Sequence, residues 1–402
     1  MFQIRLLTRN LIVVLLSLSG LAITGDFAWA IETDEATVPL AIPQNDPLLP
    51  PEDVERELSP LEKKRIRAEI NTLEIDASTQ LELGKSDSAF ALWFRQLRLY
   101  RAINLATEIA ALGRVGEIAW QNNYGAELKV ITERLNEIYQ EAQANDSLDP
   151  DLLKNLGASY QQTRNLDTAI AVYGDLLQLS RTEANLQPEQ TYLATLGELY
   201  LDKFDYSQAA IIYQDLLSLA QAEADPILIE QYLLKLSKIY DYTQQLEQAI
   251  STKTQLINYY QDTANESSIV KLKIAVGNDY LALDQTDLAI KSYREAIAIG
   301  QSTGQIASTS EALQKLSKLY QQQEEYNSAI AAYQQLLNIE LQAYNSYGVM
   351  NSYDSLGQLY LKLEDYDRAL IAFSQGLEVA QSLDYQISYF ANLIDQVRQK
   401  IE

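Results

Sequence analysis

Between about residue 150 and residue 389, apolar positions return in one pattern at a spacing of 40 residues. Each copy begins with an anchor leucine or valine, which is followed directly by a small residue and, four positions after the anchor, by a tyrosine. An alanine lies 13 residues after each anchor, and four residues further on five of the six copies have an aromatic residue, whereas the third has Lys253. The anchors and their tyrosines are Leu156 and Tyr160, Leu196 and Tyr200, Leu236 and Tyr240, Val276 and Tyr280, Leu316 and Tyr320, and Leu356 and Tyr360. Copies in register without an insertion are typical of a repeat protein.

The spacing within each copy predicts two helices. In the first copy Leu156 and Tyr160 lie four residues apart, which places both side chains on one helix face, while Gly157 leaves a gap beside them. After a short polar stretch a second apolar series begins at Leu166 and continues with helical spacing through Ala169. We therefore expect two antiparallel helices per copy, with the tyrosine filling space between copies. One such hairpin cannot bury its apolar face alone, so stacking must form the core.

This combination of Leu-Gly-x-x-Tyr, an alanine and a second aromatic residue resembles the tetratricopeptide repeat. The resemblance covers about 240 of the 402 residues and implies an all-α fold, an α-solenoid in which antiparallel helix pairs form a right-handed superhelix. The usual repeat has about 34 residues, so 40-residue copies imply that each helix is about three residues longer. The family's proline near the end of the second helix is missing, which fits a helix that continues. HEAT and armadillo repeats also have about 40 residues, but the paired small and aromatic residues favour tetratricopeptide packing.

The first 30 residues have the pattern of a secretory signal peptide. Arg5 and Arg9 supply a positive start, residues 11–23 form an apolar run, and Ala28-Trp29-Ala30 is a small-x-small cleavage site. An apolar run of 13 residues is short for a membrane-spanning helix, which needs about 20, so we expect cleavage rather than a retained anchor. The sequence therefore predicts an exported protein of the periplasm or thylakoid lumen, with secretion as the alternative, and no stable membrane span after cleavage.

Residues 31–58 are rich in proline and in acidic side chains. Proline fixes φ and removes a hydrogen-bond donor, and like charges repel one another. We expect a disordered arm, which serves either as a spacer after the signal or as a docking tail.

Residues 59–149 predict a helical cap of degenerate repeats before the array. The run Ser59-Pro60-Leu61-Glu62 is a helix start, with serine as the N-cap, proline at the first position and glutamate three residues after the cap. A second helix is expected over residues 88–112, after which Gly113 and Gly116 break the pattern. At the other end of the chain, residues 384–402 predict a capping helix.

Three arginines follow one strip of the helix expected over residues 88–112. Arg95, Arg98 and Arg101 are spaced i, i+3 and i+6 between two apolar faces, and a helix that is apolar on most sides is largely buried. Their guanidinium groups therefore either pair with carboxylates of this chain or form a patch for an acidic partner, whose carboxylates a planar guanidinium binds in a forked geometry.

Composition argues against several classes of function. The chain carries 55 acidic and 31 basic side chains, for a net charge of −24, and contains no histidine and no cysteine. Nucleic-acid binding needs a basic surface, and the commonest general base, the soft metal ligands and the thiol nucleophile are missing. No phosphate loop, Gly-x-Ser-x-Gly motif or metal-spaced cluster occurs, and no pair of carboxylates stands out. We therefore predict a chain that is not an enzyme and uses no metal, cofactor, small-molecule substrate or nucleic acid.

In tetratricopeptide proteins the first helix of each pair lines a concave groove, and the resemblance places groove residues two before and two, five and six after each anchor. An unidentified protein or peptide is the partner that this implies. The candidate binding residues are Lys238, Asp241, Tyr242, Asn278, Lys318, Gln322, Gln358 and Lys362 in the repeats, together with Arg95, Arg98 and Arg101 before them. The Lys/Asn clamp for two carboxylates that one subclass has is missing, because Lys154 is followed by Ala158 where the clamp needs asparagine.

Two functions remain open at this point. The first is an exported scaffold that binds a protein or peptide in its groove and assists the assembly of an envelope or membrane complex. The second is an envelope-associated structural spacer, held by its amino-terminal arm or by an uncleaved signal.

Overall fold

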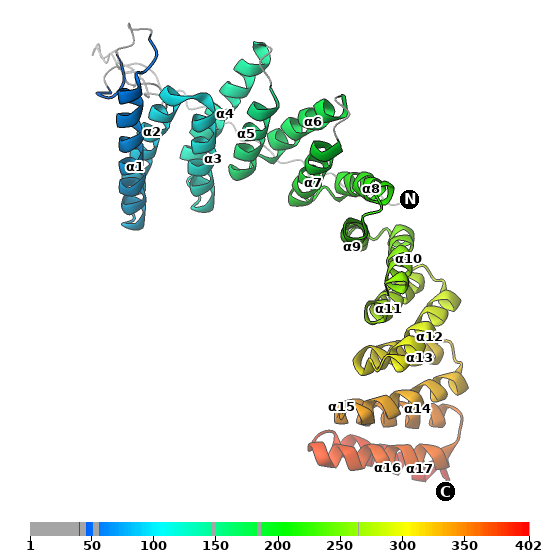
Figure 1. Ribbon diagram of the computed structural model, residues 1–402. Coiled ribbons are helices and arrows are strands. Elements are labelled where there is room, and N and C mark those ends of the chain that lie inside the picture. The colour runs from blue at the N-terminus through cyan, green and yellow to red at the C-terminus, as the bar shows by residue number, and fades with distance from the viewer. Residues whose placement is uncertain are drawn as a thin grey trace, which may run out of the picture. The chain divides into compact units, whose positions relative to one another are not determined.

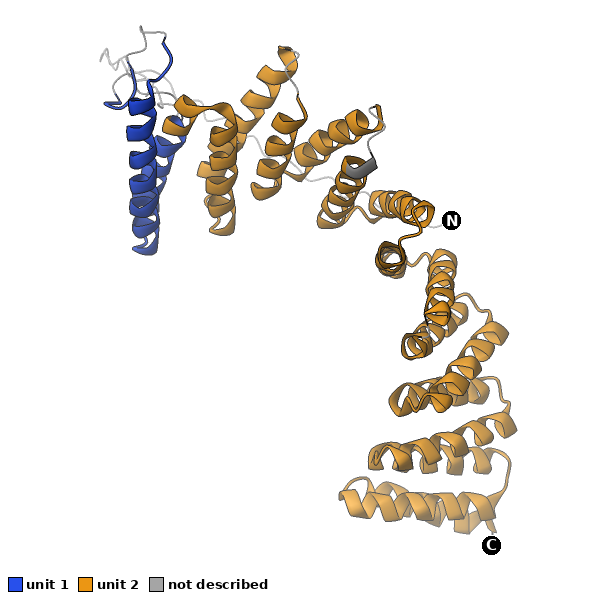
Figure 2. Cartoon of the chain, viewed as in Figure 1, with its two compact units in different colours: residues 1–98 blue, residues 99–402 orange. Residues whose placement is uncertain are grey.

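The computed structural model describes residue 40 and residues 46–50, 56–145, 149–182, 186–263 and 265–401. Within these residues the chain consists of helices α1 to α17 and contains no strand, which confirms the all-α prediction (Figure 1). The expected signal peptide over residues 1–30, and most of the arm over residues 31–58, lie outside the described residues. Two compact units are distinguished, residues 1–98 and residues 99–402 (Figure 2).

The first unit contains α1 (Pro60–Glu82) and most of α2 (Ser86–Ile103). The start of α1 has the predicted capping box, because the side chain of Ser59 accepts a hydrogen bond from the amide of Glu62, and the side chain of Glu62 accepts one from the amide of Ser59. The apolar side chains of Ile66 and Ile70 are buried, as the helical spacing predicts.

Part of the predicted arm is held within this first unit. Asp46 is 8% exposed, its Oδ1 accepts a hydrogen bond from the amide of Leu48, and its Oδ2 forms an ion pair with Arg95 at 3.1 Å. Leu40 is also buried. At these described residues the arm differs from the disordered segment that its composition predicts. The reason is that Arg95 of α2 forms an ion pair with one of its carboxylates, Asp46.

The single helix expected over residues 88–112 is two helices. After α2 ends at Ile103, α3 (Leu105–Gln121) begins, and Asn104 lies between them. The side chain of Asn104 accepts a hydrogen bond from the amide of Thr107 at 2.8 Å and thereby caps α3. The prediction of one continuous helix was wrong because the apolar spacing continues across this asparagine cap.

The prediction that Gly113 and Gly116 break the helix is also wrong, because both lie inside α3 and are buried. A Cβ atom on Gly113 would lie 2.2 Å from the side chain of Gln162, and one on Gly116 would lie 2.4 Å from the side chain of Thr163. These glycines therefore allow the start of the repeat array to pack closely on α3. Helix α4 (Gly125–Ala144) completes the segment before the array.

Six helix pairs follow in the described residues, as the 40-residue register predicts. From α7 to α15 every helix has 17 residues, and each begins 20 residues after the previous one, so a helix and a three-residue turn make half a repeat. The first helices are α5 (Pro150–Gln162), α7 (Leu186–Asp202), α9 (Pro226–Tyr242), α11 (Glu266–Ala282), α13 (Ile306–Gln322) and α15 (Ser346–Lys362). The second helices are α6 (Leu166–Thr182), α8 (Tyr206–Ala222), α10 (Leu246–Asp262), α12 (Thr286–Ser302), α14 (Tyr326–Gln342) and α16 (Tyr366–Leu383).

Residues with positive φ end these helices, and most of them are not glycine. In the turn after α9, Gln244 has a φ of 56°, and the amide of Gln245 bonds back to the carbonyl of Tyr240 at 3.0 Å. The turn after α12 uses Gly304 at a φ of 70°. A left-handed conformation costs a non-glycine residue about 1–2 kcal/mol. Glycine therefore marks few of the helix ends in this sequence. Short polar stretches between the apolar series mark them better.

In the four copies that have glycine after the anchor, this glycine receives the ring of the second helix. A Cβ atom on Gly277 would lie 2.5 Å from the ring of Tyr293, and one on Gly357 would lie 2.4 Å from the ring of Phe373. Both rings are buried. The gap that glycine leaves is therefore filled from within the same repeat.

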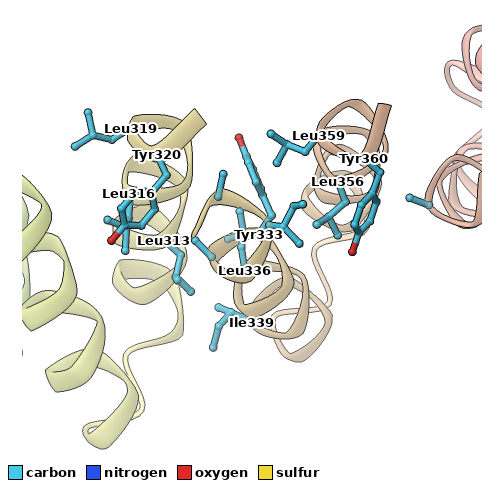
Figure 3. Packing of buried hydrophobic residues seen from close by; sticks show 14 of the residues in the cluster. Leu313, Leu316, Leu319, Tyr320, Tyr333, Leu336, Ile339, Leu356, Leu359 and Tyr360 are labelled. Carbon is cyan, nitrogen blue, oxygen red and sulfur yellow. The ribbon is translucent and has the colours of Figure 1, made fainter. Parts of the chain in front are cut away.

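The anchor tyrosine reaches the preceding repeat, as predicted. The hydroxyl of Tyr240 accepts a hydrogen bond from Gln214 of α8 at 2.6 Å, and that of Tyr360 accepts one from Gln334 of α14 at 3.2 Å. Figure 3 shows how Tyr320, Tyr333 and Tyr360 alternate with leucines through the continuous core of the later repeats. The array ends in α17 (Ile387–Ile401), whose Phe390, Ile394 and Val397 are buried.

Candidate interaction surface

The predicted groove residues lie on the first helices of repeats three to six, which are α9, α11, α13 and α15. The anchors Leu236 and Leu316 are buried, so the positions two, five and six after each anchor turn away from the core. Seven of these side chains are exposed, whereas Gln358 is half-buried. The exposed side chains are Lys238, Asp241, Tyr242, Asn278, Lys318, Gln322 and Lys362. We call this surface the first-helix face.

Two lysines of the first-helix face are not neutralised by the chain itself. Lys238 of α9 and Lys318 of α13 are exposed and form no ion pair with any described residue. The neighbouring Lys235, by contrast, pairs with Glu198 at 2.8 Å. In a chain with a net charge of −24, two unpaired lysines at equivalent positions of nearby repeats are available to a partner's carboxylates.

Helix α9 carries an apolar stripe along this face. Ile227 is 74% exposed, Leu234 is 38% exposed and Tyr242 is 72% exposed, and Lys238 lies between the last two in the sequence. A hollow of about 350 Å³ extends over Ile227, Leu234 and Lys238. Large apolar side chains that remain exposed on one helix face are typical of a surface that a partner covers.

Tyr242 belongs to an exposed cluster of three aromatic rings. It stacks on Tyr206 with ring centroids 5.7 Å apart, and Phe204 lies edge-on to Tyr206 at 6.4 Å. Phe204 is 75% exposed and has a φ of 59°, a conformation that bulky residues rarely adopt. Sequence reasoning selected Tyr242 but missed Tyr206 and Phe204. The available signal was Phe204 alone, because it lies in a turn position that is polar in the other copies, whereas Tyr206 has the counterparts Tyr326 and Tyr366.

An ionic cluster lies beneath the first-helix face between repeats three and four. Lys253 takes the place of the aromatic ring, is 3% exposed, and donates hydrogen bonds to Asp241 Oδ1 and Asp279 Oδ2, each at 2.6 Å. Burial raises the pKa of Asp279 above its ordinary value, and Asp241 adds to the rise, although the hydrogen bond and charge of Lys253 oppose it. One oxygen of the predicted binding residue Asp241 is therefore already engaged. Sequence reasoning noted Lys253 as an exception but did not connect it with Asp279 of the next repeat. Asp279 lies at a position where the neighbouring repeats have the apolar residues Ile239 and Leu319.

Tyrosines of the second helices orient polar groups on the first helices of their own repeats. The hydroxyl of Tyr293 donates to Asn278 Oδ1 at 2.8 Å, and that of Tyr213 donates to Glu198 Oε1 at 2.6 Å. Burial, with the charges of Asp279 and Glu311, raises the pKa of Tyr293 to about 12, so this hydroxyl remains a donor at neutral pH. The side-chain oxygen of Asn278 is thus occupied, which leaves its amide nitrogen to face a partner.

Arg95 and Arg101 of the arginine strip are engaged by carboxylates of this chain. Arg95 pairs with Asp46 at 3.1 Å and with Glu69 at 2.6 Å. Within the second unit Arg101 pairs at 2.7 Å with Glu108, a carboxylate that is 1% exposed and also pairs with Arg134. Arg98 is half-buried. These contacts match the internal-pairing alternative for Arg95 and Arg101 and distinguish the strip from Lys238 and Lys318.

No group of three or more potential metal ligands occurs among the residues that the structure describes. Across the same residues, none of the helices combines the length and the apolar character that crossing a membrane requires.

Two stretches of the array match family models described as tetratricopeptide repeat. They are residues 269–342, which span most of repeats four and five, and residues 351–382 of repeat six. The first three repeats continue the same 40-residue register. A comparison with curated proteins finds no match.

The chain is also similar to several solved structures. BtubC from P. vanneervenii is 18% identical with a TM-score of 0.36, over 55% of this chain and 92% of that protein. MamA is 23% identical with a TM-score of 0.34, over 47% of this chain and 96% of MamA. The apo form of RapI is 12% identical with a TM-score of 0.35, over 84% of this chain and 98% of RapI.

Proposed function

The chain is a tetratricopeptide-repeat protein, and from this premise we propose that it is a non-enzymatic scaffold that binds a protein or peptide along the first-helix face of repeats three to five. The observation that carries the proposal is the pair of unneutralised lysines, Lys238 and Lys318, beside the exposed apolar stripe of α9. Cations and apolar side chains on one exposed surface suit a segment that carries both carboxylates and apolar residues.

The expected affinity is modest and depends on salt. An exposed lysine contact contributes a few tenths to about 1 kcal/mol and is screened by salt. Tyr242 contributes more, because aromatic side chains that become buried at an interface carry a large share of the binding free energy. Its stacking on Tyr206 holds the ring in place before binding, which lowers the entropic cost of ordering it.

The test begins with capture of the partner by crosslinking and continues with quantitative binding to variants of the full chain. We expect Lys238→Glu/Lys318→Glu to weaken binding by about tenfold or more, because two attractive contacts become repulsive. Tyr242→Ala should weaken it through loss of the buried ring. A matched control, Lys291→Glu/Lys400→Glu, makes the same change in net charge at exposed positions outside the first-helix face.

A specific result would move the binding site elsewhere. If Lys238→Glu/Lys318→Glu and Tyr242→Ala fold and bind like the parent while Arg95→Glu/Arg98→Glu loses binding, the partner uses the arginine strip and not the first-helix face. An equal loss of binding in the Lys291→Glu/Lys400→Glu control would mean that the net charge of the chain causes the effect, and not the position of the two lysines.

Export to the periplasm or thylakoid lumen, and a role in assembling an envelope or membrane complex, complete the proposal. The support is the sequence of residues 1–30, with its positive start, apolar run and Ala28-Trp29-Ala30 site. Amino-terminal sequencing of the protein from its native cells tests this point. A mature start at Ile31 in a fraction free of membranes supports an exported scaffold, whereas an intact amino terminus in the membrane fraction supports the alternative, an envelope-associated spacer held by its signal.

A further inference from the structure

A second hollow lies away from the first-helix face, between the second helices of repeats four and five. It has a volume of about 360 Å³ and is lined by α12, by α14 and by Leu316 and Tyr320 of α13. Its polar lining includes Arg294, Gln301 and Gln335. The volume lies within the range of small-ligand sites, which is about 300–1,000 Å³.

Tyr320 lines this hollow and has a buried hydroxyl without a hydrogen-bond partner among the described residues. The residue is only 4% exposed. The equivalent hydroxyls of Tyr240 and Tyr360 each accept a hydrogen bond from a glutamine of the preceding repeat. In Figure 3 the hydroxyls of Tyr320 and Tyr360 point to the opposite side from that of Tyr333. A buried polar group that lacks a partner carries a free-energy penalty, which a ligand that supplies the partner removes.

Arg294 accounts for the missing partner of Tyr320. It occupies the position that Gln214 and Gln334 hold in repeats two and five, 26 residues before the tyrosine. Its guanidinium carbon lies 5.6 Å from the ring centroid of Tyr320, so it contacts the face of the ring and not the hydroxyl. Arg294 is exposed and forms no ion pair with any described residue. A guanidinium that no described carboxylate neutralises therefore lies over the ring of the tyrosine whose hydroxyl is unsatisfied.

The hollow exists because two positions around it have small side chains. Ala331 of α14 is equivalent to Ile211 and Ile371 in repeats two and six. Ala298 of α12 is equivalent to Asn338 in the next repeat. Both alanines line the hollow and give it apolar walls. Arg294, Ala298 and Ala331 thus meet at one place, and no other repeat has an arginine at the position of Arg294 or an alanine at the position of Ala298.

We propose that this hollow binds a carboxylate that is attached to a small apolar group. The guanidinium of Arg294 can hold both carboxylate oxygens in a forked geometry, and the hydroxyl of Tyr320 can donate to one of them. The apolar walls take the rest of the ligand and favour such a molecule over a bare inorganic anion. The source is either a free small carboxylate or an acidic side chain of a protein, and both share the chemistry that the site recognises. This site does not depend on the first-helix face.

The repeats themselves supply two variants that test the proposal without disrupting the fold. Arg294→Gln places here the glutamine that bonds the anchor tyrosine at two of the other repeat boundaries, and removes the cation. Ala331→Ile fills the hollow with the side chain that repeats two and six carry, and leaves the charge unchanged. Lys400→Gln is the control, because it removes an exposed cation of α17 that belongs to neither surface.

Hexanoate is the probe for a free small carboxylate, and acetyl-Leu-Glu-Leu amide is the probe for an acidic side chain. Hexanol and the peptide with Gln in place of Glu control for the apolar part. Binding to the full chain is measured by ligand-observed NMR titration. We expect at least one carboxylate probe to saturate the parent and its uncharged control to bind far more weakly. Arg294→Gln should weaken binding by about tenfold or more, as loss of a hydrogen bond to a charged group does.

Thermal unfolding supplies a readout that does not need a ligand. We expect Arg294→Gln to raise the unfolding temperature, because the introduced glutamine satisfies the buried hydroxyl of Tyr320. Ala331→Ile should abolish probe binding, and Lys400→Gln should bind like the parent. The proposal is overturned if neither carboxylate probe saturates the parent, if the uncharged controls bind equally well, or if Arg294→Gln and Ala331→Ile retain the affinity of the parent.

Discussion

Repeats three and four fill one equivalent position of the fold in opposite ways. In repeat four Tyr293 packs its ring on Gly277, and its hydroxyl bonds to Asn278 of the same repeat. In repeat three the same position is Lys253, which bonds to Asp241 of its own repeat and to Asp279 of the next. We call the first arrangement the ring junction and the second the ionic junction.

The two junctions stabilise the array by different physics. The ring junction depends on burial and close packing, so its contribution scales with the apolar area removed from water. The ionic junction places an ammonium group that is 4% exposed between carboxylates that are 47% and 12% exposed, and its desolvation offsets much of the attraction. The ionic junction also connects two repeats through one side chain. Repeats with the same backbone can therefore differ in how strongly, and under which conditions, they are coupled.

The largest effect should come from emptying the ring junction. We expect Tyr293→Ala to lower the free energy of unfolding by about 3–5 kcal/mol, as truncation of a buried aromatic ring does. Because each repeat contacts mainly its neighbours, the loss of amide-exchange protection should concentrate in α11 to α13. A uniform loss of protection over α5 to α16 would contradict this and would mean that the array unfolds as one unit.

A smaller effect should come from breaking the ionic junction. We expect Lys253→Met to cost about 2–4 kcal/mol, because it leaves the largely buried Asp279 without its cation. The change is measured as the opening free energy of α10 and α11 from amide exchange. If Lys253→Met is neutral, the carboxylates already find sufficient solvent and the ionic junction does not couple the repeats.

The matched double variant separates the loss of packing from the loss of charge pairing. Lys253→Met/Asp279→Leu removes both charges and restores at position 279 the leucine found as Leu319 and Leu359 in later repeats. We expect most of the lost stability to return, since replacing a buried ion pair by apolar side chains is often neutral or stabilising. Failure of the second substitution to restore protection would show that the lysine acts through packing alone.

The 40-residue register in the sequence was sufficient to predict the helix pairs and the general position of the first-helix face. Periodicity reports which side chains face the core, and this is why Leu236 and Tyr240 were placed correctly. It reports poorly on contacts between residues far apart in the chain. Gly113 and Gly116 were interpreted as helix breakers because the approach of α5 is not visible in their local sequence.

The parts of the candidate sites that were missed all depend on departures from the repeat pattern. Lys253 and Asp279 are unusual residues in adjoining helices, and Arg294 and Ala298 are unusual residues of one helix that line the same hollow. Each departure alone resembles ordinary variation, and only the fold shows that they meet. Comparing equivalent positions across copies, and asking which exceptions fall in adjoining helices of neighbouring repeats, would have indicated the first pair from the sequence.

The smallest effect that separates the two junctions is their response to pH. Burial raises the pKa of Asp279 above its ordinary value of 3.8, so over the range just above that value the folded chain binds more protons than the unfolded chain. Stability contributed at this site is therefore fully present below the ordinary pKa and falls as the pH rises through the raised value. The ring junction has no such dependence in this range, because the pKa of Tyr293 is raised to about 12.

We expect the stability of Lys253→Met/Asp279→Leu relative to the parent to be more favourable at pH 7 than at pH 4. The measurement is amide exchange in α10 and α11, with correction for intrinsic exchange rates. An equal or larger advantage at pH 4 would mean that Asp279 is fully stabilised by Lys253, and that the ionic junction behaves like an ordinary favourable salt bridge.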